Sequence, residues 1–356
     1  MGQGPLKGLR VVEIAGIGPA PFAVTLLSDL GAEILRIDRP GAGPAPGDVT
    51  ARGRASLALD LKSETDLKTA RAAIAAADVL IEGFRPGVME RLDLGPESML
   101  AANPRLIYGR MTGWGQEGPL APRAGHDLTY IAVTGALNAI GPRGGPPVPP
   151  LNLIGDYGGG ALYLVMGVLA ALHERQSSGR GQVIDAAVVD GVVSMMGLFS
   201  WLTGDGVTSM ATGEGMLAGA LPTYRTYECS DGRHVAVGAL EPQFQAELRR
   251  RLDLPAEAPA GFDAQTEELA AVFRTHPRDH WTVLLEDTDA CVAPVLHFAE
   301  APDHPHLAAR QSFTELDGRT QPNVAPRLSR TPGRIQGPPV AAGIGGADLL
   351  KAWGVA

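Results

Sequence analysis

The first third of the chain alternates short apolar runs with longer amphipathic stretches. Short apolar runs bounded by turn residues predict strands, and apolar residues spaced three or four positions apart predict helices. The predicted elements are a strand over residues 9–14, a helix over 20–30, a strand over 33–38, an extended segment over 56–61, a helix capped by Ser63 and running to Ala77, and strands over 79–81 and 106–111. Strands that alternate with helices in this way form a parallel sheet covered by helices, which binds ligands at the carboxyl ends of its strands.

The pattern changes after a helix-rich middle region, residues 125–203. A predicted hairpin has strands over residues 224–228 and 234–238, and two helices and a short final helix follow it. We therefore predict an α/β protein with a large doubly wound, Rossmann-like domain over residues 1–203, a linker over 204–222, a smaller α+β domain over 223–315, and a C-terminal segment over 316–356 that returns to the large domain.

Composition and charge restrict the class of protein. The chain has 356 residues, 45% of them hydrophobic, which is enough for a large core. Its 30 basic and 39 acidic residues give a formal charge of −9, which argues against a nucleic acid or an anionic membrane surface as the main partner. The N-terminal residues contain no apolar run of signal-peptide length, and the longest clean apolar stretch, residues 161–172, is too short to cross a bilayer. We expect a cytoplasmic protein that does not enter a membrane.

The two cysteines do not form a recognisable framework. Cys229 and Cys291 are too few for a disulfide scaffold and lack the spacing of metal ligands. We expect both to be small buried apolar residues, and we predict no metal site.

A glycine-rich turn, residues 16–21, follows the first strand and opens the first helix. With Asp38 at the end of the next strand, it suggests a dinucleotide site. Pro21, however, occupies the place where a small residue normally lets helix and strand pack closely. The alternative is a tight connection in a sheet that binds another ligand.

Basic residues gather in the first domain although the chain as a whole is acidic. They are Arg36, Arg39, Arg52, Arg54, Lys62, Arg85 and Arg91. Guanidinium and ammonium groups suit the phosphates of a nucleotide-containing ligand, but a solvated surface is an alternative for each of them. Arg85 is the most specific candidate, because glycines precede and follow the Phe-Arg-Pro sequence at a strand exit and allow a ligand to approach the backbone.

His126 and Asp156 are candidates for acid–base chemistry. His126 is a candidate because an imidazole can both take up and release a proton under physiological conditions, although a lone histidine is often structural. Asp156 precedes the apolar helix predicted from residue 161, where it is either a capping residue or a proton carrier beside backbone donors that hold an enolate oxygen.

Short runs spread along most of the chain, in the expected order, resemble alpha-methylacyl-CoA racemases. These runs are Val11–Glu13, Asp29–Glu33, Arg36–Pro40, Phe84–Gly87, Met111–Gln116, Gly125–Asp127, Ile154–Asp156 and Ala236–Phe244. The resemblance implies an interlocked homodimer that acts on acyl-CoA thioesters. It also implies that coenzyme A enters as part of the substrate, with no separate cofactor.

The resemblance also assigns roles to individual residues. It implies a catalytic pair, His126 and Asp156, with Glu241 orienting the imidazole. The residues that it implies for binding coenzyme A are Arg39, Lys62, Arg85 and Arg91 at the phosphates, Leu61 and Gly83 along the adenine and pantetheine path, and Asp127 and Tyr130, with Asn152, next to the catalytic pair.

Two other functions stay open at this stage. Family III CoA-transferases resemble the chain in fold and use an aspartate matching Asp156 as a nucleophile, but they usually carry an aromatic residue where this chain has His126. A non-catalytic binding protein for CoA thioesters would need the basic residues but neither His126 nor Asp156. Two opposed bases instead allow a proton to leave one face of a carbon and return to the other.

Overall fold

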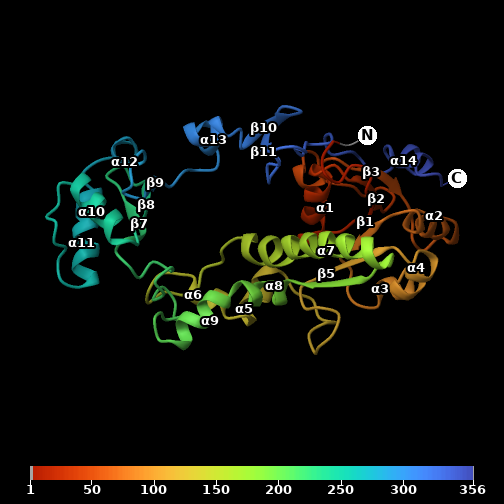
Figure 1. Ribbon diagram of the computed structural model, residues 1–356, viewed down its shortest axis with the longest axis horizontal. Coiled ribbons are helices and arrows are strands. Elements are labelled where there is room, and N and C mark those ends of the chain that lie inside the picture. Colours follow the sequence, from red (N-terminus) through yellow and green to blue (C-terminus); the bar gives the residue numbers. More distant parts are fainter. Residues whose placement is uncertain (1–2, 356) are drawn as a thin grey trace. The chain divides into compact units, whose positions relative to one another are not determined.

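The computed structural model describes residues 3–355, and the chain divides into two compact units (Figure 1). The large unit contains the segment that ends at Thr134, the segment Leu151–Met195 and the segment that begins at Pro305. The small unit contains Gly135–Pro150 and Met196–His304. The chain therefore enters and leaves each unit more than once.

A six-stranded sheet forms the centre of the large unit. All neighbouring strands are parallel, in the order β3-β2-β1-β4-β5-β6. The strands are β1 (Arg10–Ile14), β2 (Glu33–Asp38), β3 (Ala55–Ala58), β4 (Val79–Glu82), β5 (Ile107–Thr112) and β6 (Val183–Ala187). The parallel, doubly wound sheet that the alternating pattern predicts is confirmed.

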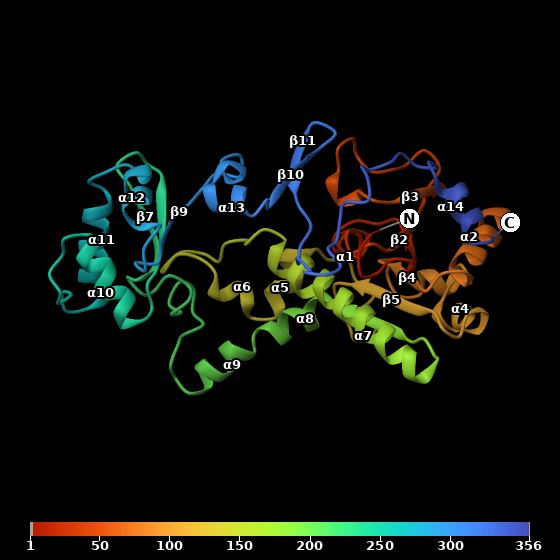
Figure 2. The same ribbon diagram turned by 45° about the horizontal axis from the view of Figure 1, so that its top comes forward.

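Helices cover both faces of this sheet. Those of the large unit are α1 (Pro19–Asp29), α2 (Glu64–Ala75), α3 (Val88–Arg91), α4 (Pro96–Ala102), α5 (Asp127–Val133), α7 (Leu162–Ser178), α8 (Val188–Met195), α13 (Pro305–Ala309) and α14 (Gly346–Ala352), with the short helix η1 (Val49–Ala51) and the π-helix η2 (Leu153–Ala161). The Ser63 hydroxyl caps α2 by accepting the N–H of Asp66, as predicted. Alternate strand residues such as Val12 and Leu80 form one core with α2, α4 and α14, and α14 lies beside α2 (Figure 2).

The helix α7 packs on the opposite face of the sheet. Gly109 of β5 allows this approach, since a methyl group at that position would lie 3.0 Å from Leu164. Because η2 leads directly into α7, the helical segment Leu153–Ser178 is 26 residues long, which is longer than the apolar stretch predicted from sequence. It is the one helix among the described residues whose length and composition suit a membrane span, a test that core helices of soluble proteins also pass.

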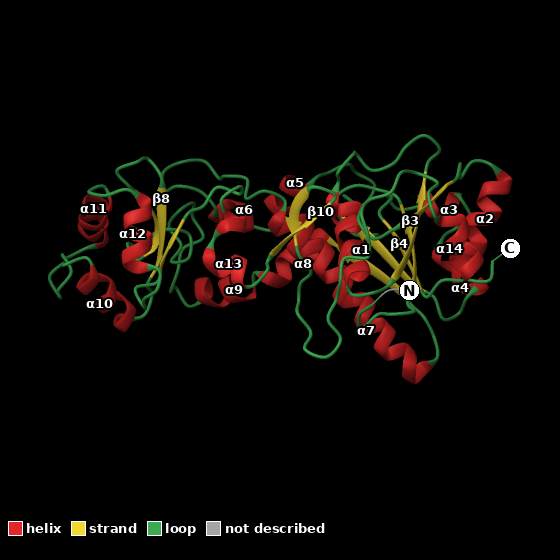
Figure 3. Cartoon of the chain, turned by 90° about the horizontal axis from the view of Figure 1, so that it is seen from above, coloured by secondary structure: helices red, strands yellow, loops and turns green. Residues whose placement is uncertain are grey.

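The small unit has its own sheet and its own core. The antiparallel sheet β7 (Tyr224–Glu228), β8 (His234–Gly238) and β9 (Val292–Pro294) confirms the predicted hairpin. Helices α10 (Pro242–Arg251), α11 (Phe262–Phe273) and α12 (Arg278–Leu285) pack around it (Figure 3), and α6 (Ala136–Ala139), α9 (Gly197–Gly204) and η3 (Ala301–Asp303) complete the unit. Cys229 is buried in this core, as predicted, whereas Cys291 is only half-buried.

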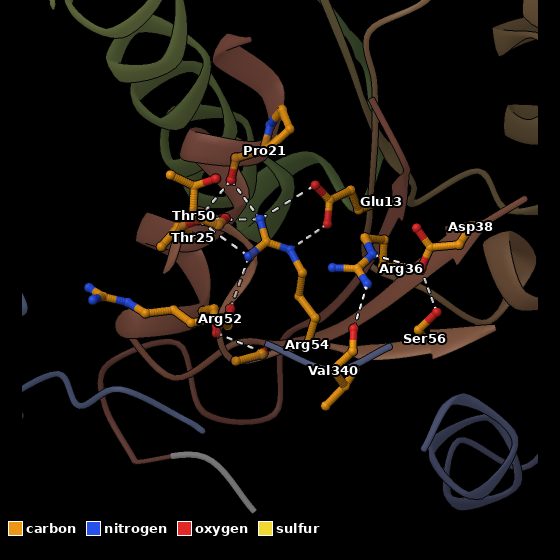
Figure 4. A network of polar contacts seen from close by, with 12 residues as sticks. Glu13, Pro21, Thr25, Arg36, Asp38, Thr50, Arg52, Arg54, Ser56 and Val340 are labelled. Carbon is orange, nitrogen blue, oxygen red and sulfur yellow. Dashed lines mark hydrogen bonds and ion pairs between the residues drawn. The ribbon is translucent and has the colours of Figure 1, made fainter. Parts of the chain in front are cut away.

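The C-terminal segment packs against the first strands of the large unit. It contains a hairpin of β10 (Phe313–Leu316) and β11 (Arg319–Pro322) and ends in α14. The Arg36 guanidinium donates to the carbonyl oxygen of Val340 at 3.2 Å (Figure 4), and the N–H of Ser56 donates to the carbonyl oxygen of Ile344.

Three of the basic residues considered for phosphate binding are structural instead. Arg36 pairs with Asp38, Arg54 with Glu13 at 2.6 Å, and Arg52 with Asp29 at 2.6 Å, all of them buried. Figure 4 shows the Arg54 and Arg36 pairs side by side. The alternative of a solvated surface does not hold for these three arginines, because each is buried beside a carboxylate partner.

Candidate active site

A cavity of about 300 Å³ lies at the carboxyl edge of the large sheet. Its walls come from the segments that follow β1, β4 and β5, together with the first residues of α5 and η2. It brings together five residues predicted from sequence, namely Gly83, Arg85, His126, Tyr130 and Asp156. The cavity therefore lies where ligands are expected in a doubly wound sheet.

A hydrogen bond from the main chain of Asp156 fixes this residue in the cavity. It belongs to the first turn of η2, and its N–H donates to Asp127 Oδ1 at 2.6 Å. Burial raises the pKa of the Asp156 carboxyl, and the nearby Asp127 charge raises it further, while a hydrogen bond from Asn152 and the interaction with His126 oppose these effects. A carboxyl whose pKa lies above its ordinary value is better matched to an imidazole for proton exchange.

The glycine turn after β1 lies against this carboxylate. Gly18, the residue before α1, has φ of 77°, and a methyl group on it would lie 3.6 Å from Asp156 Oδ2. The start of α1, where a dinucleotide would place its pyrophosphate, thus faces a carboxylate of the protein itself. This arrangement favours the alternative of a tight connection that shapes a different ligand site.

His126 is the residue that immediately precedes α5. Its N–H donates to Thr129 Oγ1 at 3.0 Å, and the Thr129 hydroxyl donates back to the His126 carbonyl oxygen at 2.8 Å. These two bonds fix the backbone of His126 at the start of the helix, with the residue lining the same cavity as Asp156.

Two sequence motifs meet around the ring of Tyr130. Methyl groups on Gly113 or Gly125 would overlap this ring, and the Trp114 ring meets it edge-on with 4.8 Å between centroids. Burial and the charge of Asp156 raise the pKa of Tyr130, so its hydroxyl stays protonated at neutral pH. The glycines of both motifs are therefore required for close packing against an aromatic wall of the cavity.

A second pocket, of about 730 Å³, collects the predicted basic residues. Arg39, Leu61, Lys62, Arg85 and Arg91 all line it, on segments that follow β2, β3 and β4. Phe84, Val88 and Leu92 supply apolar surface, and two carboxylates, Asp38 and Asp60, also border it. Arg85 and Phe84 line both pockets, whereas Gly83 lines the first cavity and not this pocket.

Glu241 belongs to the small unit. It is the residue immediately before α10, and its charge contributes to a raised pKa of Cys291, whose main cause is burial. It is not among the residues that line the cavity of the large unit.

Sequence reasoning missed a buried charged group next to Gly83 of the cavity. Glu82, the last residue of β4, is fully buried and pairs with Arg110 of β5. The available signal was a glutamate that continues the apolar run of residues 79–81 without a break.

A parallel sheet with a ligand cavity at its carboxyl edge and a cationic pocket beside it defines an α/β protein suited to a phosphate-bearing ligand. The CoA-transferase family III profile matches residues 6–343, and the chain belongs to this family.

Curated relatives agree over nearly the whole chain. Alpha-methylacyl-CoA racemase of Mus musculus is 45% identical over 335 residues, and that of Homo sapiens is 41% identical over 337 residues. Each comparison covers 92% of this chain and 87% of the relative. The crystal structure of a CAIB/BAIF family protein from Brucella suis, 26% identical, superposes with a TM-score of 0.84 over 99% of this chain and 100% of that one.

Proposed function

We propose that this chain is an isomerase of the alpha-methylacyl-CoA racemase type, which interconverts the (2R) and (2S) forms of 2-methylacyl-CoA thioesters. One structural observation carries the proposal: His126 and Asp156 line one cavity, and Arg85 connects this cavity to the cationic pocket. The 45% and 41% identity to curated racemases supports the reaction class.

The two cavity residues divide the chemistry between the two faces of the substrate. One of them takes the proton from the carbon next to the thioester carbonyl and leaves an enolate, and the other returns a proton to the opposite face. The raised pKa of Asp156 supports this exchange of roles. The N–H of Asp156 is unavailable to an enolate oxygen, because it already donates to Asp127.

The cationic pocket is suited to the phosphates of coenzyme A. Arg39, Lys62, Arg85 and Arg91 supply positive charge, and Leu61 lies on the same pocket. Gly83, Asp127 and Tyr130 belong to the reacting end, where Gly83 and Tyr130 line the cavity and Asp127 holds Asp156. Coenzyme A enters as part of the thioester, so the chemistry proposed here uses neither a metal nor a separate cofactor.

We further propose a homodimer in the cytoplasm. On α7, Leu162, Met166 and Leu169 are 52%, 58% and 38% exposed, and their spacing places them on one face of the helix. An apolar face of this kind fits an interface with a second copy of the chain. In such a dimer, Glu241 of the partner subunit is the residue that we expect to orient His126.

The competing function is CoA transfer with Asp156 as nucleophile. His126 argues against it, because a transferase would form an acyl anhydride on Asp156 and would not need a second base. The deciding experiment measures deuterium uptake at the α-carbon of a 2-methylacyl-CoA in heavy water, together with CoA transfer to free carboxylates. Exchange without transfer supports the racemase, and transfer without exchange contradicts it.

A further inference from the structure

Three charged side chains form a bridge that connects β4, β5 and α3. Glu82 at the end of β4 and Arg110 on β5 stand opposite each other in the register of the sheet. Arg110 Nε–H donates to Glu82 Oε1 at 3.1 Å, and its two terminal nitrogens donate to the carboxylate oxygens of Glu90 at 2.7 and 3.3 Å. Because the guanidinium is buried and bonded at both ends, its position is tightly determined.

The bridge holds the two segments that carry basic residues of the pocket. Glu82 Oε2 accepts the N–H of Phe84 at 2.7 Å, and Arg85 is the next residue. Glu90 lies in α3 directly before Arg91. One buried guanidinium thus connects the backbone that presents Arg85 with the helix that presents Arg91.

The loop and the helix are also connected to each other. The N–H of Val88 donates to the carbonyl oxygen of Arg85, and the N–H of Arg91 donates to that of Gly87. Gly87 has φ of 82°, which a residue with a side chain rarely adopts, so the turn between the two arginines requires glycine at this position. Glu82 is therefore connected by hydrogen bonds to the segments that carry both arginines.

We propose that Glu82, Arg110 and Glu90 are positioning residues that set the placement of Arg85 and Arg91 for the phosphates of the acyl-CoA substrate. The inference rests on the function proposed above and adds three residues that touch no substrate. Neither the racemase nor the transferase chemistry uses these groups, yet fully burying a carboxylate such as Glu82 is costly unless it is paired.

The variant Glu82→Gln tests this proposal. It keeps the size of the side chain, but above pH 7, where Glu82 is ionised, its amide cannot serve Arg110 and the N–H of Phe84 as the carboxylate does. We expect the Kd for coenzyme A, measured by titration calorimetry, to rise about 3- to 10-fold, the range of one weakened charge-assisted hydrogen bond. The KM for 2-methylacyl-CoA should rise by the same factor, while kcat stays within about twofold, because the bridge does not touch the reacting atoms.

A double-mutant cycle separates positioning from a general loss of structure. If Glu82 acts through the two arginines, Glu82→Gln should have no further effect on the Kd once Arg85→Ala and Arg91→Ala are present. An effect that is undiminished in this background, or an unchanged Kd in the single variant, overturns the proposal. Glu90→Gln, at a more exposed site, provides the same test with less risk to folding.

The matched control is Asp29→Asn, which also removes a buried carboxylate paired with an arginine, Arg52, but lies on neither pocket. We expect it to lower the melting temperature without changing the Kd. A parent protein that binds no coenzyme A would overturn the proposed function itself. A parent that binds it and a Glu82→Gln variant with equal affinity would overturn only the positioning role.

Discussion

The main-chain N–H of Asp156 donates to the carboxylate of Asp127, 2.6 Å away. A methyl group on Gly155, the residue between Ile154 and Asp156, would overlap Asp127 Oδ1, so glycine is needed at this position for the contact. The same carboxylate that holds Asp156 in place also raises its pKa. Both the position and the pKa of Asp156, the proposed base, therefore depend on Asp127.

The variant Asp127→Asn should change the pH dependence of the reaction. Its amide oxygen still accepts the N–H of Asp156, but the negative charge is gone, so the pKa of Asp156 should fall. We expect the acid limb of kcat/KM against pH to move to lower pH. Glu64→Gln, on the exposed face of α2, is the control. An acid limb that does not move would mean that ionisation of Asp156 does not govern it.

Removing the arginine shared by both pockets should weaken binding. For Arg85→Ala we expect a loss of about 1.5–3 kcal/mol in affinity for a CoA thioester, the range of a hydrogen bond to a charged group. Titration calorimetry measures this loss, and Arg180→Ala, at an exposed site that lines neither pocket, serves as the control. Equal affinity in the parent and in Arg85→Ala would remove Arg85 from the site.

The two-base assignment predicts opposite behaviour for the two catalytic variants. In His126→Ala, Asp156 can still remove and return a proton on its own face, so one enantiomer should exchange with heavy water and keep its configuration. Asp156→Ala should show the reverse preference, and racemisation should collapse in both variants. Deuterium content and enantiomeric composition of each pure enantiomer provide the measurement. Racemisation at the parental rate in His126→Ala would favour the transferase.

Glu82 should make the folded protein lose stability as the pH rises. Burial raises the pKa of Glu82 from 4.5 to about 7, so the folded state holds this proton more tightly than the unfolded chain does. The resulting stabilisation, about 3 kcal/mol, is fully present below pH 4.5 and is lost as the pH rises through 7. Arg110, Glu90 and the Tyr108 hydroxyl are the other ionisable groups of this cluster. We expect the free energy of unfolding, measured by urea titration, to fall by this amount more in the parent than in Glu82→Gln between pH 4.5 and a pH above 7. Parallel pH profiles of the two proteins would contradict the assignment.

The proposed dimer predicts that a dissociated single chain is inactive. Its motivation is the exposed apolar face of α7 and the location of Glu241 in the small unit. Sedimentation should give a dimer at all workable concentrations, and dilution should not yield an active single chain. Met166→Glu places a charge on the apolar face and should cause dissociation, whereas an active monomer in the parent would rule out a shared site.

The main elements of the fold could be predicted because buried parallel strands have a simple signature. Residues 79–81 are a continuous apolar run, and residues 33–38 contain three large aliphatic residues between turn signals; the predicted limits match β2 and β4 within a residue. The edge strand β6 was not predicted, since three of its five residues are not buried and its sequence has no continuous apolar run. The π-helix η2 was not predicted either, because its three consecutive glycines disfavour a helix.

The site could be predicted only where a reactive residue lies in a recognisable local sequence motif. His126 and Asp156 lie in glycine-containing motifs and meet in one cavity, as expected. The roles of Arg52 and Arg54 could not be predicted, because their partners, Asp29 and Glu13, come from distant parts of the chain. Glu82 and Arg110 were missed for the same reason, since their pairing depends on strand register, which the sequence does not display.

The return of the C-terminal segment to the large sheet has a consequence for synthesis. Leu350 and Trp353 complete the core around β1, β2 and β4, and the Trp353 indole donates to Glu33 Oε2 at 2.9 Å. A ribosome makes β1 first and reaches α14 more than 300 residues later. Until then one face of the sheet lacks part of its cover, although the last buried core residue of the small unit, Val292, is made about 50 residues before α14. The large unit therefore has to finish folding after the small one, and chaperones that bind exposed apolar strands would act during this interval.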